Sequence, residues 1–178
     1  GRAIATLFAR AGARTVVADR DAALADATVA AIRAGDGSAQ AHAVTADVSD
    51  PAAVRRMFVA AEAAYGTVDV LVNNAGIYYF RPFADLSVED LDRIFAVNVR
   101  GVFLCTQEAV RRLRAAGRGG SIINLSSVNS TRAVIFDNIH YGSSKAAVNG
   151  LTASAALEFA EYADRIVNPP TGPDATKQ

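Results

Sequence analysis

The sequence of 178 residues predicts an α/β fold, a doubly wound parallel sheet in three layers with helices on both faces. Two observations lead to this prediction. Short, mostly apolar segments typical of buried strands alternate along the chain with longer segments whose apolar residues recur at helical spacing. Glycines stand where several of these helical segments end. No internal repeat and no linker interrupts the pattern, so we expect one domain over residues 1–178.

Local signals set the expected boundaries of these elements. Asp50 and Pro51 are typical of a helix cap and a first helical residue, and Ser87 with Glu89 and Asp90 is typical of a capping box. The predicted helices cover residues 2–11, 21–34, 51–65, 87–115 and 141–162. The predicted strands cover residues 14–19, 41–45, 68–72, 121–125 and 165–167. The helix over 87–115 contains Asn98 and Gly101, which are poor interior helix residues, glycine by about 1 kcal/mol relative to alanine.

Composition narrows the kinds of partner. The 18 basic residues balance the 18 acidic ones, which gives no argument for binding to nucleic acid or to an anionic membrane surface. The lone Cys105 cannot form an internal disulfide, no leader opens the chain, and no apolar run is long enough to span a bilayer. No metal-ligand cluster surrounds His42 or His140. We therefore expect a cytoplasmic protein without a metal, whose partners are small molecules or proteins.

Tyr141 and Lys145 carry the clearest chemical signal. They lie four residues apart in a predicted helix, so both side chains leave the same face roughly 5–6 Å apart. An ammonium at that distance favours the phenolate form of a tyrosine, and the pair is typical of a general acid/base. Only two lysines occur in a chain otherwise rich in arginine, which suggests a need for a compact point charge. The alternative is a half-buried tyrosine covered by a surface lysine.

Four motifs together resemble the classical short-chain dehydrogenase/reductase family, over residues 1 to about 167. They are an acid at the end of the second strand of the family fold, Asn73-Asn-Ala-Gly76, Asn98 within a long helix, and a Ser-Ser pair followed by Tyr-x-x-x-Lys. The resemblance implies a Rossmann-type fold and hydride transfer between NAD(H) and a secondary alcohol or ketone.

The resemblance also implies catalytic roles for the matching positions. Tyr141 would be the acid/base, and Lys145 would favour its phenolate and hold the ribose hydroxyls of the cofactor. Ser127, the second serine of its pair, would orient the substrate oxygen. Asn98 would distort its helix and hold a water in the proton relay. A buried amide bonded to a neighbouring carbonyl is the alternative for Asn98.

The choice of cofactor depends on Asp19. A carboxylate at this strand end accepts hydrogen bonds from the adenosine ribose and repels a 2′-phosphate, which favours NAD over NADP. Arg20 complicates this prediction, because an arginine beside the acid could bind a 2′-phosphate. Asp47 resembles the residue that contacts the adenine amine, and a plain helix cap is its alternative role. The remaining expected cofactor contacts are Val48 beside the adenine, Asn73, Ala75 and Gly76 along the ribose, and Gly1 as the last glycine of the phosphate loop.

The sequence also departs from the family pattern. The family's first strand and most of its phosphate loop have no counterpart before Gly1, and no counterpart of its last strand and substrate lid follows Val167. We interpret the chain as an internal fragment or a product altered at both ends, with a gap in the sheet between the strands that end near Asp19 and Asn73.

Two hypotheses about function follow. The chain is an NAD-dependent alcohol dehydrogenase or carbonyl reductase, or it is a catalytically inactive fragment or relative that retains an interaction surface. In either case the family suggests a homodimer or homotetramer through the helices over 87–115 and 141–162. Tyr78, Tyr79 and Phe80 could be core residues or a pocket wall, and the substrate is not assigned.

Overall fold

The computed structural model describes residues 1–133, 135–160 and 165–167 of the chain. It forms two compact units, Gly1–Val68 and Asp69–Gln178. Each unit contains parallel strands joined through helices, as the α/β prediction requires. The prediction of a single domain over residues 1–178 stays a prediction.

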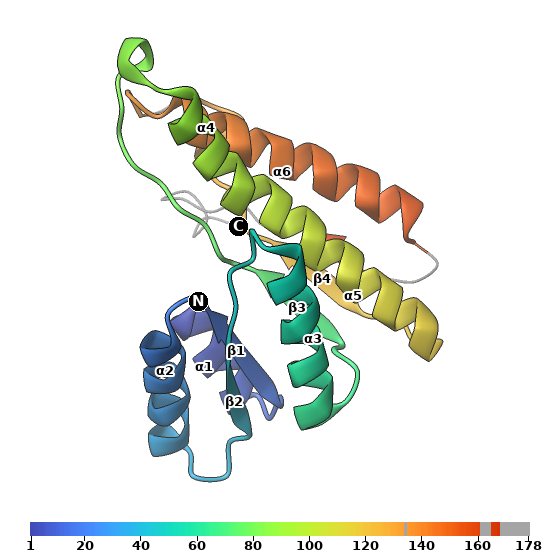
Figure 1. Cartoon of the computed structure of the whole chain (residues 1–178). Helices are drawn as coiled ribbons and strands as arrows, with labels where there is room; N and C mark the ends of the chain where they lie inside the picture. The colour runs from blue at the N-terminus through green and yellow to red at the C-terminus, as the bar shows by residue number, and fades with distance from the viewer. Residues whose placement is uncertain (134, 161–164, 168–178) are drawn as a thin grey trace. The chain divides into compact units, whose positions relative to one another are not determined.

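The first unit is a two-stranded parallel sheet with three helices (Figure 1). Its elements are α1 (Arg2–Arg10), β1 (Thr15–Asp19), α2 (Ala22–Gly35), β2 (Ala41–Thr45) and α3 (Pro51–Tyr65). The strands pair in register from Thr15 with Ala41 to Asp19 with Thr45. Small side chains allow α1 and α2 to approach the strands closely, around a core of Ala9, Val29, Ile32 and Ala41.

Side-chain caps explain where the helices of this unit begin. The carboxylate of Asp21 accepts hydrogen bonds from the backbone N–H groups of Ala23 and Leu24, so α2 begins one residue later than predicted. Asp50 accepts from the N–H of Ala52 and precedes Pro51, which confirms both predicted roles.

The second unit is a three-stranded parallel sheet with strand order β3-β4-β5. Its strands are β3 (Val70–Asn73), β4 (Ser121–Asn124) and β5 (Arg165–Val167). Its helical segments are η1 (Phe83–Asp85), α4 (Val88–Phe95), η2 (Ala96–Gly101), α5 (Val102–Ala116), η3 (Val128–Ser130) and α6 (Ile139–Glu158). The strand predicted over 68–72 begins only at Val70. The helix predicted over 141–162 begins two residues earlier and ends at Glu158; residues 161 and 162 lie outside the described residues.

The long helix predicted over 87–115 is interrupted. Ser87 caps α4 by accepting from the N–H of Asp90, as the capping box predicts. The segment from Ala96 to Gly101 is a π-helix that contains Asn98, and α5 continues from Val102. π-helical turns of this kind are often found at functional sites. The poor helix formers therefore mark a local change in winding.

A buried chain of polar side chains joins β3 and β4 to two helices. Asn73 and Asn124 are register partners, and Nδ2 of Asn73 donates to Oδ1 of Asn124 at 2.8 Å. Asn73 also donates to Thr106 of α5, and Asn124 donates to Thr152 of α6, at 3.2 and 3.0 Å. All four side chains are buried. The network holds both helices against the ends of the two strands.

The described strands form two separate sheets. Neither β1 nor β3 has a second hydrogen-bonded neighbour among them. The predicted gap between the strands ending near Asp19 and Asn73 stays a prediction. Within the described residues, no helix combines the length and the apolar character needed to cross a membrane.

We expect Asn124→Ala to lower the free energy of unfolding by about 2–3 kcal/mol, because Asn73 and Thr152 each lose one hydrogen bond in a buried site. Urea unfolding followed by circular dichroism measures this loss. Ser154→Ala, at an exposed position of α6, is the control and should change stability little. Equal stability of the two variants would contradict a structural role for the network.

Candidate active site

Tyr141 and Lys145 lie on the same face of α6. The Nζ atom of Lys145 is 5.8 Å from the centroid of the Tyr141 ring, which confirms the predicted spacing. Lys145 is only 5% exposed, so the alternative of a surface lysine is wrong. Its Nζ donates a hydrogen bond of 2.7 Å to the carbonyl of Leu125, just after β4, and burial lowers the pKa of Lys145. The lysine is therefore tethered beside a half-buried tyrosine.

The two serines after β4 have different surroundings. Ser126 is buried, and its hydroxyl donates to the backbone carbonyl of Lys145 at 3.1 Å. Ser127 is half-buried, and its Oγ accepts the N–H of Asn129 at the start of η3. The hydroxyl hydrogen of Ser127 has no acceptor among the described residues. Of the two serines, Ser127 is thus the one whose hydroxyl can donate a hydrogen bond to a ligand.

Asn98 clamps the segment that follows Gly76. Its Oδ1 accepts from the N–H of Ile77 at 2.8 Å, and its Nδ2 donates to the carbonyl of Ile77 at 2.9 Å and to Ser144 Oγ at 3.1 Å. The side chain is fully buried. These bonds match the alternative of a buried amide bonded to a neighbouring carbonyl, and the predicted water in a proton relay stays a prediction.

Gly76 leaves space directly beside two of the predicted catalytic residues. A Cβ atom at this position would lie 3.4 Å from Oδ1 of Asn98 and 3.7 Å from Nζ of Lys145. Ala75 and Gly76 are exposed, whereas the Asn73 side chain is buried in the network with Asn124. Of the three predicted ribose contacts, only Ala75 and Gly76 thus present their side-chain positions to a ligand.

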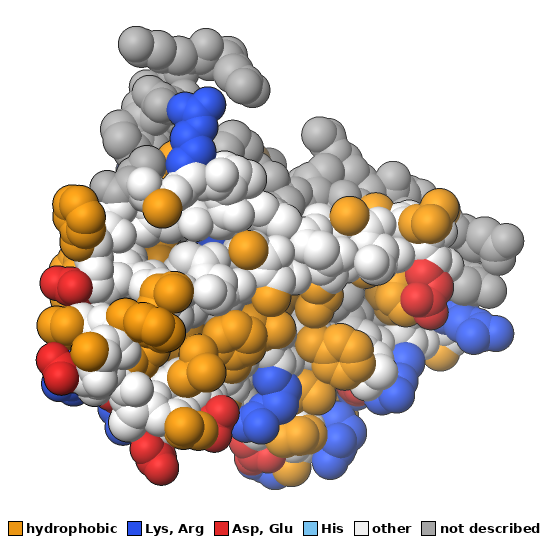
Figure 2. All heavy atoms as spheres, turned by 90° about the horizontal axis from the view of Figure 1, so that it is seen from above, with side chains coloured by type: hydrophobic (Ala, Val, Ile, Leu, Met, Phe, Trp, Pro, Cys, Tyr) orange, Lys and Arg blue, Asp and Glu red, His pale blue; other side chains and the backbone are white. Residues whose placement is uncertain are grey.

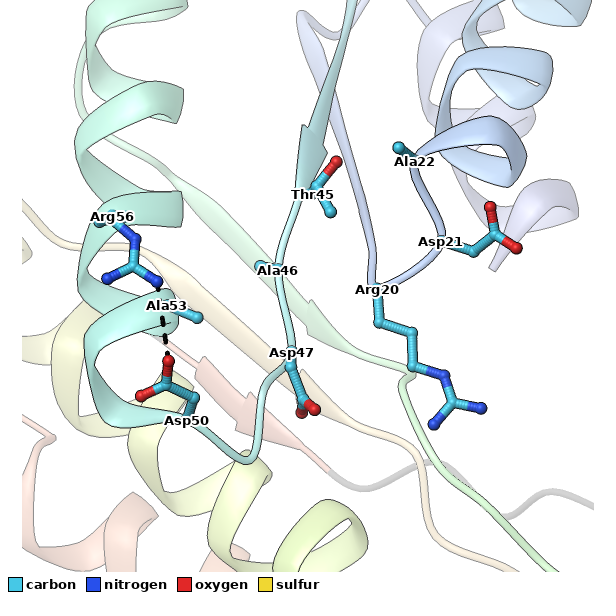
Figure 3. A pocket seen from close by; sticks show the side chains of 9 residues that line it. All are labelled: Arg20, Asp21, Ala22, Thr45, Ala46, Asp47, Asp50, Ala53 and Arg56. Atoms are coloured by element: carbon cyan, nitrogen blue, oxygen red, sulfur yellow. Dashed lines mark ion pairs between the residues drawn. The ribbon is translucent and has the colours of Figure 1, made fainter.

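A pocket in the first unit lies where β1 and β2 end and α3 begins (Figure 3). Its volume is about 800 Å³, within the range of small-molecule sites. The side chains that line it are those of Arg20, Asp21, Ala22, Thr45, Ala46, Asp47, Asp50, Ala53 and Arg56. Arg56 pairs with Asp50 at 3.6 Å, and Arg20 and Asp47 point the same way at one end. The lining therefore offers both carboxylates and guanidinium groups to a ligand.

Of the residues predicted for the adenosine end, Arg20 and Asp47 line this pocket, and Asp19 and Val48 adjoin them in sequence. Asp47 accepts the N–H and the hydroxyl of Ser49, while Asp50 caps α3, so the alternative of Asp47 as the helix cap is wrong. Asp19 is half-buried, and its Oδ1 accepts the N–H of Asp21. Val48 is half-buried beside Asp47. Gly1 is exposed before α1.

The aromatic residues after Gly76 alternate in exposure. Tyr79 is half-buried, with its ring 4.9 Å from that of His140 and its hydroxyl donating to the carbonyl of Asp90 at 2.6 Å. Tyr78 and Phe80 are exposed. Tyr79 is therefore held by contacts within the unit, whereas its two neighbours are exposed.

Sequence reasoning missed several polar residues that build the site. Asn124 and Ser144 are fully buried, and Ser144 Oγ donates to the carbonyl of Tyr141 while it accepts from Asn98. The one available signal was a polar residue inside an apolar strand, Asn124 at the end of 121–125. Cys105 is buried, and burial raises the pKa of its thiol to about 12. Over the described ranges, no three His, Cys, Asp or Glu side chains gather as a metal site would require.

A sequence model of the short chain dehydrogenase family matches residues 1–176. The chain belongs to this family. The match agrees with the resemblance inferred from the motifs around Gly76, Asn98 and Tyr141.

Individual members of the family are similar along most of the chain. A sorbitol dehydrogenase of Cereibacter sphaeroides is 38% identical over 91% of this chain, and an NADPH-dependent aldehyde reductase-like protein of Arabidopsis thaliana is 41% identical over 89%. These matches cover 61% and 62% of the relatives' own lengths. The crystal structure of a short chain dehydrogenase from Mycobacterium smegmatis superposes with a TM-score of 0.89 at 33% identity, over 96% of this chain and 71% of that one. This likeness confirms the Rossmann-type fold of the family.

Proposed function

We propose that the protein is an oxidoreductase that transfers a hydride between NAD(H) and a secondary alcohol or ketone, with Tyr141 as the acid/base. The observation that carries the proposal is the pairing of Tyr141 with a buried Lys145 at 5.8 Å beside the space left by Gly76. Membership in a dehydrogenase family supports it.

In such a reaction, four side chains of the second unit have separate roles. Tyr141 takes the hydroxyl proton of an alcohol during oxidation and returns it to the carbonyl oxygen during reduction. Lys145 holds its side-chain nitrogen beside the tyrosine ring, and Ser127 donates a hydrogen bond to the substrate oxygen. Asn98 holds Ile77 and thereby the position of Gly76. NAD(H), when bound, accepts or supplies the hydride.

The described residues of each unit, taken by itself, fit one part of a dinucleotide. In the second unit, the exposed Gly76 places no side chain between a ligand and Nζ of Lys145, which can donate to ribose hydroxyls. In the first unit, Asp19 would accept from the adenosine ribose, with Arg20, Asp47 and Val48 beside it and Gly1 at the pyrophosphate. NAD is favoured because the Asp19 carboxylate repels a 2′-phosphate.

An exposed apolar face supports assembly into a homodimer or homotetramer. Val88 and Leu91 of α4, Phe103 of α5 and Leu157 of α6 are exposed, and Leu157 is 85% accessible. Figure 2 shows several groups of exposed hydrophobic side chains on one face of the molecule, interspersed with charged ones. We propose that a second copy of the chain covers this face. The same face would serve the catalytically inactive relative that is the alternative to the enzyme.

We further propose a cytoplasmic location, supported by a cysteine content of one, since secreted domains commonly contain paired cysteines. Fractionation of cells that express the tagged chain tests this location. Recovery outside the cytoplasm would contradict it.

Tyr141→Phe should lower kcat about 10²–10⁴-fold while NADH binding is retained, because only the transferable proton is lost. Steady-state oxidation of secondary alcohols by the full chain, paired with NADH fluorescence, measures both effects. Tyr65→Phe on α3 removes a hydroxyl from the first unit and is the matched control. Turnover that survives in Tyr141→Phe would exclude Tyr141 as the acid/base, and no turnover by the unaltered chain would favour the inactive relative.

Asp19→Ala should weaken NADH binding about tenfold, because charge-assisted hydrogen bonds to the ribose are lost, and should not weaken NADPH binding. Fluorescence titration with the two reduced cofactors measures the ratio of their dissociation constants. Asp26→Ala, an exposed change of equal charge on α2, is the control. Tighter binding of NADPH than of NADH by the unaltered chain would instead assign Arg20 to a 2′-phosphate.

Leu157→Glu should shift the assembly toward the monomer, because a charge in an apolar interface must be desolvated. Sedimentation equilibrium of the unaltered chain and of Leu157→Glu measures the shift in oligomeric state. Val59→Glu, at an exposed apolar position of α3, is the control. A monomeric unaltered chain would refute the proposed interface.

A further inference from the structure

The segment Tyr78-Tyr79-Phe80 presents two aromatic rings outward beside the proposed acid/base. Tyr79 is anchored in the unit by its contact with His140 and by its bond to the carbonyl of Asp90. Tyr78 and Phe80 are 66% and 59% exposed and meet edge to face, with ring centroids 6.1 Å apart. The anchored ring between them thus holds two exposed rings in place as a pair.

The Tyr78 ring also adjoins Tyr141. Their centroids are 6.0 Å apart, with an interplanar angle of 60°, an edge-to-face contact. A substrate whose oxygen reaches the Tyr141 hydroxyl therefore brings the atoms attached to its reacting carbon within reach of Tyr78.

The loop before α6 and the first residue of α6 also carry exposed apolar side chains. The N–H of Arg81 donates to the carbonyl of Asp137 at 2.8 Å, which ties this loop to the aromatic segment. Ile135, Phe136 and Ile139 are exposed around that tie, Phe136 by 91%. We call Tyr78, Phe80, Ile135, Phe136 and Ile139 the apolar wall.

The apolar wall offers few partners for polar groups. Apart from the Tyr78 hydroxyl, its side chains contain no hydrogen-bond donor or acceptor. The neighbouring Arg81 is directed to Asp90, with Nε 3.5 Å from the carboxylate. Burying the hydroxyls of a polyol against such a surface would leave them without partners, which is unfavourable, whereas burying an aryl or alkyl group is favourable.

We propose that the substrate is a secondary alcohol or ketone with an apolar aryl or alkyl body, and that Tyr78 and Phe80 select it. The inference rests on the proposed function for its chemistry, but it assigns a substrate class that the proposed function leaves open. It separates this chain from the sorbitol dehydrogenase to which it is similar, whose name specifies a polyol.

Binding without turnover gives the first test. Acetophenone is titrated into the full chain without cofactor and followed by saturation-transfer NMR, with sorbitol as the polar probe. We expect acetophenone to bind and Tyr78→Ser to weaken it about tenfold, as expected for loss of one aromatic contact. Because Tyr78 is exposed, its replacement does not open a cavity. Val59→Ser on α3 is the matched exposed control and should leave binding unchanged.

Turnover gives the second test. The ratio of kcat/KM for 1-phenylethanol to that for sorbitol is measured in the unaltered chain and in Tyr78→Ser and Phe80→Ser. We expect a ratio above one that falls about tenfold in either variant. A change in Val59→Ser of the same size would overturn the assignment.

The outcomes separate this inference from the proposed function. Turnover that depends on Tyr141 but prefers sorbitol leaves the proposed function intact and overturns the apolar substrate. Binding of acetophenone that depends on Tyr78, without turnover of any alcohol, supports the apolar site and contradicts the proposed activity. Acetophenone binding that is absent or independent of Tyr78 overturns the inference.

Discussion

The amide pair of Asn73 and Asn124 is the interaction on which the second unit depends. The two residues end adjacent parallel strands in register, and each amide continues to a threonine on a different helix. An unpaired buried amide is unfavourable by about 1–3 kcal/mol, so each member needs the others. β3, β4, α5 and α6 are therefore held in one arrangement. Lys145 lies seven residues, about two turns, before Thr152 on α6, so the network also sets the face on which the lysine stands.

The change in helical winding at Asn98 converts this framework into a site. The π-helical segment brings a buried amide to the backbone of Ile77, and both of its polar atoms are used there. This clamp holds Gly76 beside Lys145, where the missing side chain leaves room for a ligand. An ordinary helix residue at 98 would gain helical propensity but would leave the segment after Gly76 without these bonds.

Burial and exposure are sharply divided around Tyr141. Lys145, Ser144 and His140 lie in the interior, and the buried Lys145 ammonium is held by the carbonyl of Leu125. Tyr78 stands on the outer side of the same tyrosine. A group at the Tyr141 hydroxyl thus meets a fixed charge on the protein side and an apolar surface on the solvent side, an arrangement suited to a polar reacting centre on an apolar body.

The sequence by itself determined the kind of fold, the order of its elements and the placement of Tyr141 and Lys145 on one helix face. Local rules suffice for these features. The alternation of strand and helix segments, the helix caps and the four-residue spacing of Tyr141 and Lys145 all depend on residues close together in sequence. Only the tertiary structure decided that Asn73 belongs to a buried network with Asn124, and that Tyr79 packs on His140 while Tyr78 and Phe80 are exposed. These outcomes depend on hydrogen-bond partners and packing surfaces supplied by residues far away in sequence. A polar or aromatic residue type alone does not reveal which partner it will meet.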